Sequence, residues 1–174
     1  WLKQEGKIDH WGIGLGQGEA LIKAINYSKP PEAMQCAVNV LNSIGAIGYV
    51  NEKNDPNKIL NECQNKNIPI LAIRAVQAGA LTSSMDRKPH ESGFDIEDFK
   101  DFEKALPFRE YAKKVNENPA SLAHRYALSQ EKVSSVILGV KNRKELLECI
   151  KAESAGELDK KMLANLNNLF KNMK

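Results

Sequence analysis

Short apolar segments alternate with amphipathic helical patterns along the whole chain, and this alternation constrains the fold more than any other feature. The apolar segments are residues 8–14, 33–41, 68–73 and 133–139. Between them, hydrophobic residues recur at the three- and four-residue spacing of amphipathic helices. Alternating strands and helices predict an α/β fold with a parallel sheet and right-handed crossovers. Four such units fit either a small open sheet or half of an eight-stranded barrel, and periodicity does not separate the two.

Capping residues mark where the helices are predicted to begin. Proline follows Asp55 and Asn118, which suits the first helical position after an N-cap. Glu145 lies three residues after Asn142, the spacing of a capping box, and Asp159 precedes a last helix. The apolar residues expected on the inner helix faces are Ala20, Leu21, Ala24, Ile25, Ile59, Leu60, Cys63, Leu122, Ala123, Tyr126, Ala127, Leu146, Leu147, Ile150, Met162, Leu163, Leu166, Leu169, Phe170 and Met173.

Two segments differ sharply in polarity. Residues 68–73 are apolar throughout, which is typical of a strand buried on both faces. Residues 82–98 are polar and irregular, and they are predicted to form one long loop of the kind that is often functional in compact domains. The acidic residues at its end and beyond are predicted to form a solvated face: Glu97, Asp98, Asp101 and Glu103.

The composition argues against several classes of protein. The 174 residues have room for one domain, and 42 % hydrophobic with 27 % charged residues is an ordinary globular balance. The net charge of +3 is small and spread out, so we expect no nucleic-acid partner. No apolar run approaches the roughly 20 residues that cross a bilayer, and residues 1–7 do not resemble a signal peptide. The three cysteines lack metal-ligand spacing. We therefore expect a cytoplasmic chain with reduced thiols, no metal site and no membrane contact.

A ligand is expected at the segments that follow the strands, because ligands of parallel α/β proteins meet the carboxyl ends of the strands. After the first strand, glycines alternate with other residues at Gly12, Gly14, Gly16 and Gly18. Such a run allows close approach of the backbone to a ligand, or only a tight turn into a helix. It is not a phosphate-binding P-loop, because no Gly-Lys-Ser/Thr follows.

Two further segments carry charges that suit an anion. Arg74 directly follows an apolar strand and needs either a ligand phosphate or a protein carboxylate as its partner. Residues 139–144 (Gly-Val-Lys-Asn-Arg-Lys) run into a helix N-terminus, where free N–H groups, the helix dipole and Lys141 favour an anion. A solvated basic cap is the alternative for this second segment.

Polar residues of the second strand and the histidines are less specific. Gln35 and Asn39 share one face of that strand, where each must bond to a ligand amide or to neighbouring backbone. His10 and His124 share no motif with a serine, cysteine or aspartate, so both are expected to be structural.

Four segments, in order, resemble the C-terminal half of the aldo/keto reductase barrel. Residues 6–13 are similar to the fifth strand of that family, and residues 35–42 (Gln-Cys-Ala-Val-Asn-Val-Leu-Asn) to its sixth. Residues 72–81 resemble the seventh-strand loop of a subgroup that carries Ile-Arg there. Residues 135–142 resemble the eighth strand leading into the cofactor helix. The resemblance implies strands 5–8 and the following helices of a (β/α)8 TIM barrel, with the whole chain as a single partial domain.

The resemblance also implies a function. The complete protein would reduce small aldehydes or ketones by hydride transfer from NADPH, with NADH as the alternative, and this chain would be its cofactor-binding half. The residues implied in binding are Gln35 at the nicotinamide carboxamide, Arg74, Ala75, Gly79 and Ala80 at the pyrophosphate, Lys141 at the 2′-phosphate, Glu148 at the adenine, and Gly139 and Asn142 beside them.

Some positions depart from the family's pattern. Gly14 and Leu15 replace a Ser-Asn pair that helps to hold the nicotinamide, and Ile73 replaces the aromatic residue that stacks on it. Cys149 replaces an asparagine. Glu145 stands where the family has Arg or Gln, and a carboxylate is unfavourable beside a 2′-phosphate.

The catalytic Tyr, Lys, Asp and His of the family come from its first four strands, so the resemblance implies no catalytic residue in this chain. A general acid must lie within hydrogen-bonding reach of the substrate oxygen. The alternatives are a non-catalytic nicotinamide-binding half-barrel, two copies that close one barrel by two-fold symmetry, and an unrelated flavodoxin-like domain. Half a barrel would keep two unpaired strand edges, which favour aggregation.

Overall fold

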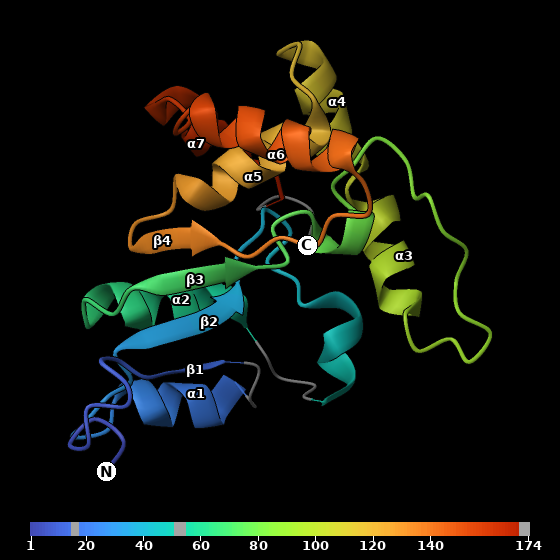
Figure 1. Cartoon of the computed structure of the whole chain (residues 1–174). Helices are drawn as coiled ribbons and strands as arrows, with labels where there is room; N and C mark the ends of the chain where they lie inside the picture. The colour runs from blue at the N-terminus through green and yellow to red at the C-terminus, as the bar shows by residue number, and fades with distance from the viewer. Residues whose placement is uncertain (15–17, 51–54, 171–174) are drawn as a thin grey trace.

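The sheet consists of parallel strands that lie in chain order. A computed structural model describes residues 1–14, 18–50 and 55–170. Within them the strands are β1 (Gly12–Gly14), β2 (Ala33–Ala37), β3 (Ile70–Ile73) and β4 (Val133–Val136). Each pairing is parallel, so the carboxyl ends of the strands share one edge of the sheet, as the arrowheads in Figure 1 show. The predicted parallel sheet is confirmed, although each strand is shorter than its predicted segment.

The helices begin where the capping residues predict. The side chains of Asp55, Asn118, Asn142 and Asp159 each accept a hydrogen bond from the backbone N–H three residues further on. The α-helices are α1 (Gly18–Ile25), α2 (Pro56–Asn65), α3 (Ile96–Lys104), α4 (Leu106–Lys114), α5 (Pro119–Leu128), α6 (Arg143–Ser154) and α7 (Lys160–Asn168). Two short 3-10 helices, η1 (Gly45–Val50) and η2 (Gln77–Gly79), follow β2 and β3.

One face of the sheet packs against helices and the other stays partly open. Most buried residues of the first core come from β2, β3, α1 and α2: Leu21, Ile25, Met34, Cys36, Ile59, Leu60, Cys63, Ile70 and Ala72. On the opposite face, Gln35, Leu71 and Ile73 are only half-buried. In Figure 1, α2 lies behind β2 and β3, whose nearer face carries no helix. The prediction that residues 68–73 are buried on both faces is therefore wrong for the face that carries Gln35, Leu71 and Ile73, which we call the inner face.

A second core lies between α4, α5 and α7. Phe108, Leu122 and Leu166 are almost completely buried there, and Tyr126 is buried beside them. The predicted inner face of α5 is confirmed, because Leu122, Ala123, Tyr126 and Ala127 are all buried. In α7 only Leu166 is fully buried, while Met162 and Leu163 pack partly against this core. Met173 lies outside the described residues.

The inner face predicted for α6 is wrong. Leu146, Leu147 and Ile150 are 42 %, 45 % and 50 % exposed, and Ala152 is the buried residue of this helix. In the described part of the chain, the sheet has no strand beyond β4. The apolar face of α6 therefore stays largely exposed there.

Close packing of the first two strands explains two of the alternating glycines. A Cβ on Gly14 would overlap the Cβ of Gln35, and a Cβ on Gly12 would overlap the backbone oxygen of Ala33. Both glycines are thus needed for β1 to approach β2, whether or not a ligand is present. Gly16 lies outside the described residues, and Gly18 begins α1.

The cysteines carry no disulfide bonds. Cys36 and Cys63 are buried in the first core, and Cys149 is half-buried. Burial raises the pKa of the Cys36 thiol to about 12 and that of Cys63 to about 11, so both stay protonated. The expectation of packing thiols is confirmed for these two. None of the described helices has the length and apolarity needed to cross a bilayer.

Candidate functional site

The loops that follow β3 and β4 enclose a cavity of about 590 Å³. These strands are neighbours in a parallel sheet, so the segments after them begin side by side. The cavity is lined from both loops and from the first two turns of α6. It brings together these residues implied in cofactor binding: Gly79, Gly139, Lys141, Asn142 and Glu148.

The remaining implied residues lie elsewhere. Gln35 lies in the middle of β2 on the open inner face, paired with Gly14 on one side and Leu71 on the other. Ala75 is buried in the first core, and the side chain of Ala80 is fully buried. Their whole-residue exposures are 4 % and 0 %, so neither alanine lines the cavity. The structure thus separates Gln35 on the strand from the cluster around the cavity.

The backbone after β3 turns through an unusual conformation. Arg74, Gln77 and Ala78 have φ angles of 59°, 48° and 50°, in the left-handed region that is costly for residues other than glycine. Hydrogen bonds fix this turn, because the N–H of Gln77 donates to the oxygen of Arg74 at 2.8 Å and the N–H of Gly79 donates to Val76 at 3.0 Å. Strained backbone of this kind is often retained at binding sites.

Arg74 has a protein carboxylate as its partner. Its guanidinium forms an ion pair with Asp98, whose side chain is 4 % exposed. Asp98 also accepts the N–H of Ala46 at 2.9 Å and pairs with Arg87 at 3.1 Å. Of the two partners that the sequence left open for Arg74, the structure shows the carboxylate.

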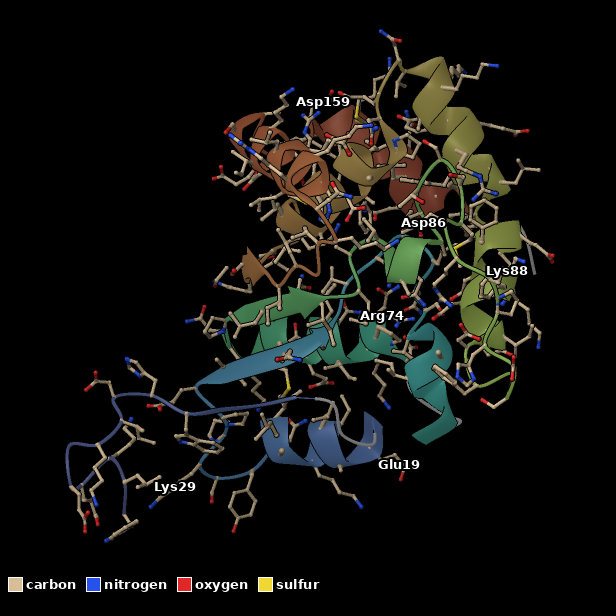
Figure 2. The ribbon with its side chains drawn as sticks, turned by 45° about the vertical axis from the view of Figure 1, so that its right-hand side comes forward. Glu19, Lys29, Arg74, Asp86, Lys88 and Asp159 are labelled. Carbon is tan, nitrogen blue, oxygen red and sulfur yellow. The ribbon has the colours of Figure 1, made fainter. Side chains whose placement is uncertain are left out.

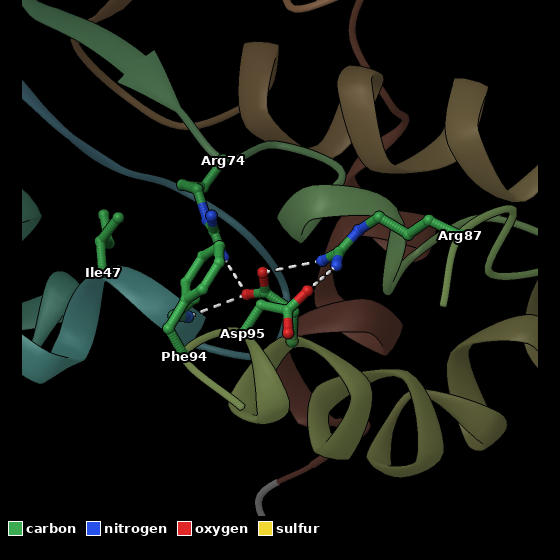
Figure 3. A pocket seen from close by; sticks show the side chains of 7 residues that line it. Ile47, Arg74, Arg87, Phe94 and Asp95 are labelled. Atoms are coloured by element: carbon green, nitrogen blue, oxygen red, sulfur yellow. Dashed lines mark hydrogen bonds and ion pairs between the residues drawn. The ribbon is translucent and has the colours of Figure 1, made fainter. Parts of the chain in front are cut away.

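Arg87 joins the 82–95 loop to the same cluster. It pairs with Asp95 as well as with Asp98, and Figure 3 shows Arg74 and Arg87 reaching the carboxylates from opposite sides. The backbone N–H of His90 and the Arg87 guanidinium hold the pKa of Asp95 below its usual range. A cavity of about 400 Å³ beside the cluster is lined partly by Phe94. Its charged lining groups already neutralise one another.

Asp101 extends the cluster toward the sheet. Its carboxylate accepts hydrogen bonds from Ser43 at 2.5 Å and from the side-chain amide of Gln77 at 2.7 Å. Asn39 donates to the side-chain oxygen of Gln77 at 3.2 Å and to the backbone oxygen of Ser43 at 2.8 Å. Asn39 therefore bonds to protein groups at the end of β2.

The prediction of a solvated acidic face is wrong for two of its four residues. Asp98 and Asp101 are each 3 % exposed, whereas Glu97 and Glu103 are exposed. The predicted loop also ends earlier, because α3 starts at Ile96. Asp98 and Asp101 are three residues apart, so they lie on one face of a helix. Because Arg74 needs an anionic partner, this pair was the signal in the sequence that could have identified one.

Carboxylates surround Lys141 at the mouth of the larger cavity. Its ammonium group forms an ion pair with Asp86 of the 82–95 loop. This contact lowers the pKa of Asp86. The backbone N–H of Lys141 donates to a carboxylate oxygen of Glu145 at 2.8 Å, and the N–H of Glu145 donates to Asn142 at 3.0 Å. The predicted capping box is confirmed only in its first half: Asn142 caps the N–H of Glu145, but the Glu145 carboxylate accepts the N–H of Lys141 and not that of Asn142. In Figure 2, Asp86 lies on the loop that passes between Arg74 and the upper helices.

The two histidines singled out in the sequence differ in environment. His124 is buried between α5 and α6, with Nε2 3.5 Å from the Cys149 sulfur. Its Nδ1 has no hydrogen-bond partner among the described residues, and burial lowers the pKa of His124. His10 is exposed, 3.7 Å from Glu32. Across residues 1–14, 18–50 and 55–170, no three His, Cys, Asp or Glu side chains are grouped to hold a metal ion.

One family model matches nearly the whole chain. Residues 1–171 match the Aldo/keto reductase family. The comparison with curated proteins finds no match. Among solved structures, the apo and holo forms of the aldo-keto reductase AKR11C1 from Bacillus halodurans have TM-scores of 0.68 and 0.69, at 16 % and 17 % sequence identity. A thermostable aldo-keto reductase, Tm1743, in complex with the inhibitor epalrestat, has a TM-score of 0.64 at 17 % identity.

The coverage of these matches is unequal. Each covers 97 % of this chain, but the chain covers only 53 %, 50 % and 51 % of the three solved chains. The chain therefore spans about half the length of the structures it is similar to. At this sequence identity the likeness shows the fold, a four-stranded parallel part of a barrel.

Proposed function

Because this chain belongs to the aldo/keto reductase family, we propose that it forms strands 5–8 of a (β/α)8 barrel and binds the nicotinamide cofactor. The segments that resemble strands 5–8 occur in that order, and their counterparts form adjacent parallel strands. The open inner face of the sheet and the bare apolar face of α6 support a partial barrel. The whole chain is then one partial domain.

The cavity between the loops after β3 and β4 is the observation that carries this proposal. It is large enough for part of a dinucleotide, and it gathers five of the nine residues implied in binding. It also ends at the N-terminus of α6, where the helix dipole and backbone N–H groups favour phosphate or hydroxyl oxygens that accept hydrogen bonds. These residues fit the adenosine end of a nicotinamide dinucleotide.

Within this proposal each residue has a role. The backbone of residues 74–80 faces the pyrophosphate, while the Arg74 side chain holds the loop in place through Asp98. Glu148 contacts the adenine, and Lys141 lies at the ribose, where the resemblance implies a 2′-phosphate in NADPH. Gln35 holds the nicotinamide carboxamide from the inner face of β2.

In the complete protein the reaction would be carbonyl reduction. The cofactor supplies a hydride to the carbonyl carbon of an aldehyde or ketone, and the carbonyl oxygen gains a proton from a general acid. That acid must reach the substrate oxygen. We assign it to the other half of the barrel, so the role of this chain is to position the nicotinamide and to exclude water from it.

A cavity-filling variant tests the site. Gly139 lines the cavity and a Cβ there would meet no atom within 4 Å, so we choose Gly139→Phe to place a ring at the cavity wall. We expect the Kd for both NADH and NADPH, measured by cofactor fluorescence, to rise at least about tenfold, or ~1.4 kcal/mol. The matched control is Glu153→Phe, on the exposed side of α6 and outside the cavity. Equal affinity of Gly139→Phe and the unaltered protein would contradict the proposal.

The alternative, a non-catalytic nicotinamide-binding half-barrel, predicts a different result for the complete protein. It keeps cofactor binding but expects no oxidation of NADH or NADPH when aldehydes and ketones are added. Turnover that is lost in Gly139→Phe and kept in Glu153→Phe supports the reductase. Binding without any turnover over a panel of carbonyl compounds supports the binding module.

A further inference from the structure

The charged groups of the larger cavity leave little positive charge for an additional phosphate. The lining contains three acidic residues, Asp86, Glu145 and Glu148, and three basic residues, Arg87, Lys141 and Lys144. Arg87 already pairs with Asp95 and Asp98, away from the cavity. Of these three basic residues, only Lys144 has no ion pair and no side-chain hydrogen bond to another described residue.

Lys141 is approached by carboxylates from two directions. Asp86 pairs with its ammonium group from the 82–95 loop. Glu145 accepts its backbone N–H at 2.8 Å and also accepts the side-chain amide of Asn142 at 3.2 Å. An anion at the start of α6 would use donors of this kind, and the Glu145 carboxylate already accepts two of them, the Lys141 N–H and the Asn142 side-chain amide.

Both carboxylates are well placed to discriminate between the two forms of the cofactor. A 2′-phosphate carries about two negative charges near neutral pH and would be repelled by Asp86 and Glu145. A ribose hydroxyl can instead donate a hydrogen bond to a carboxylate, which is how acidic residues select NAD in other dinucleotide sites. The Asp86–Lys141 pair is more than half exposed, so solvent weakens it and it does not lock the site.

We infer that Asp86 and Glu145 make this site selective for the cofactor without a 2′-phosphate, with NADH bound in preference to NADPH. This inference rests on the proposed function and deepens it. Asp86 and Glu145 accept hydrogen bonds from the ribose hydroxyls, and Lys141 keeps the two carboxylates in position at the start of α6. The selectivity therefore comes from acidic residues on two separate segments, one of them the long loop after β3.

Isosteric amides test the selectivity. The Kd values for NADH and NADPH are measured in low salt for the unaltered protein, Asp86→Asn, Glu145→Gln and the double variant. We expect the unaltered protein to bind NADH at least about tenfold more tightly than NADPH. This is the size expected from two repulsions between solvent-exposed charges. In the double variant the affinity for NADPH rises by a similar factor while that for NADH changes little. High salt should reduce the preference, because these charges are exposed.

Fragments and controls separate the possible outcomes. Adenosine 5′-monophosphate and adenosine 2′,5′-bisphosphate differ only at the 2′ position and probe this end of the cavity alone. The control variants are Glu91→Gln, on the same loop, and Glu153→Gln, on α6, which should leave the NADH to NADPH ratio unchanged. Tighter binding of NADPH, or a ratio that the double variant does not change, overturns the inference and leaves the proposed function standing. If neither cofactor binds, both fail.

Discussion

Arg74, directly after β3, fixes the segment that follows the strand through an ion pair. The pattern of an arginine after an apolar strand predicts a buried charge with an anionic partner, and the structure provides Asp98. Sequence spacing could not choose between a ligand and a carboxylate, because the two lie 24 residues apart and meet only when α3 packs over the sheet edge. Gly45 fits the same cluster, since a Cβ there would overlap the side chains of Asp98, Arg74 and Gln77.

His124 should make stability depend on pH. Burial lowers its pKa in the folded protein from the usual 6.5. Below pH 6.5 the unfolded chain takes up a proton that the folded chain does not, so the free energy of unfolding falls as the pH drops toward the folded-state pKa. The slope is at most about 1.4 kcal/mol per pH unit. We expect urea unfolding at pH 7.0 and 5.5 to show this loss, and His124→Gln to reduce it.

A surface histidine provides the comparison for His124. His10 is exposed, so His10→Gln should show the same loss of stability between the two pH values as the unaltered protein. An identical pH dependence in His124→Gln and the unaltered chain would mean that other groups cause the effect.

At the scale of elements, helix starts that depend on N-cap bonds could be predicted from sequence, whereas those that depend on tertiary packing could not. Asp55, Asn118, Asn142 and Asp159 were sufficient to predict the starts of four helices, because an N-cap bonds to a residue only three positions away. α3 was missed. Its N-cap residue, Asp95, makes no side-chain capping bond and instead pairs with Arg87, so the usual local signal is absent.

The carboxylate of Asp98 should hold α3 and the 82–95 loop on the sheet. Asp98→Asn leaves the size of the side chain nearly unchanged but removes the charge that pairs with Arg74 and Arg87. Because this leaves largely buried arginine charge without a partner, we expect the free energy of urea unfolding to fall by roughly 3 kcal/mol. Amide hydrogen exchange should increase most in residues 82–104.

An exposed acid on the same helix serves as the matched control for Asp98. Glu97→Gln should change stability by no more than about 0.5 kcal/mol, as is usual for surface positions. If exchange in Asp98→Asn increased equally in β2 and β3, the ion pairs would support the whole fold and not the docking of this loop.

At the scale of the whole molecule, two edges of the sheet carry exposed apolar side chains. Trp11 precedes β1, Ile137 directly follows β4, and Leu147 and Ile150 lie on α6, all at 40–50 % exposure. The sequence predicted the last two as buried, since helical periodicity identifies an apolar face but not whether a neighbour covers it. In the described residues, β1 and β4 each have one strand neighbour.

The exposed face of α6 should govern association of the chain. We expect the 174-residue chain, produced by itself, to form polydisperse oligomers in size-exclusion chromatography with light scattering, because both edges lack a partner. Leu147→Lys with Ile150→Lys should shift the distribution to smaller species. Tyr27→Lys, at an exposed aromatic residue outside α6, should not. A discrete dimer would favour two copies that close one barrel, and a stable monomer would contradict the role of this face.

The sequence by itself determined the local and periodic features: the parallel α/β order, the helix starts, the inner face of α5 and the segments after β3 and β4 that line one cavity. These depend on residues a few positions apart, whose backbone bonds and side-chain spacing are set along the chain. The tertiary structure alone decided that Arg74 pairs with Asp98, that Asp101 is buried, that Asp86 meets Lys141 and that the apolar face of α6 is bare. Each of these depends on which distant segments pack together, and burial and ion pairing arise only from that packing.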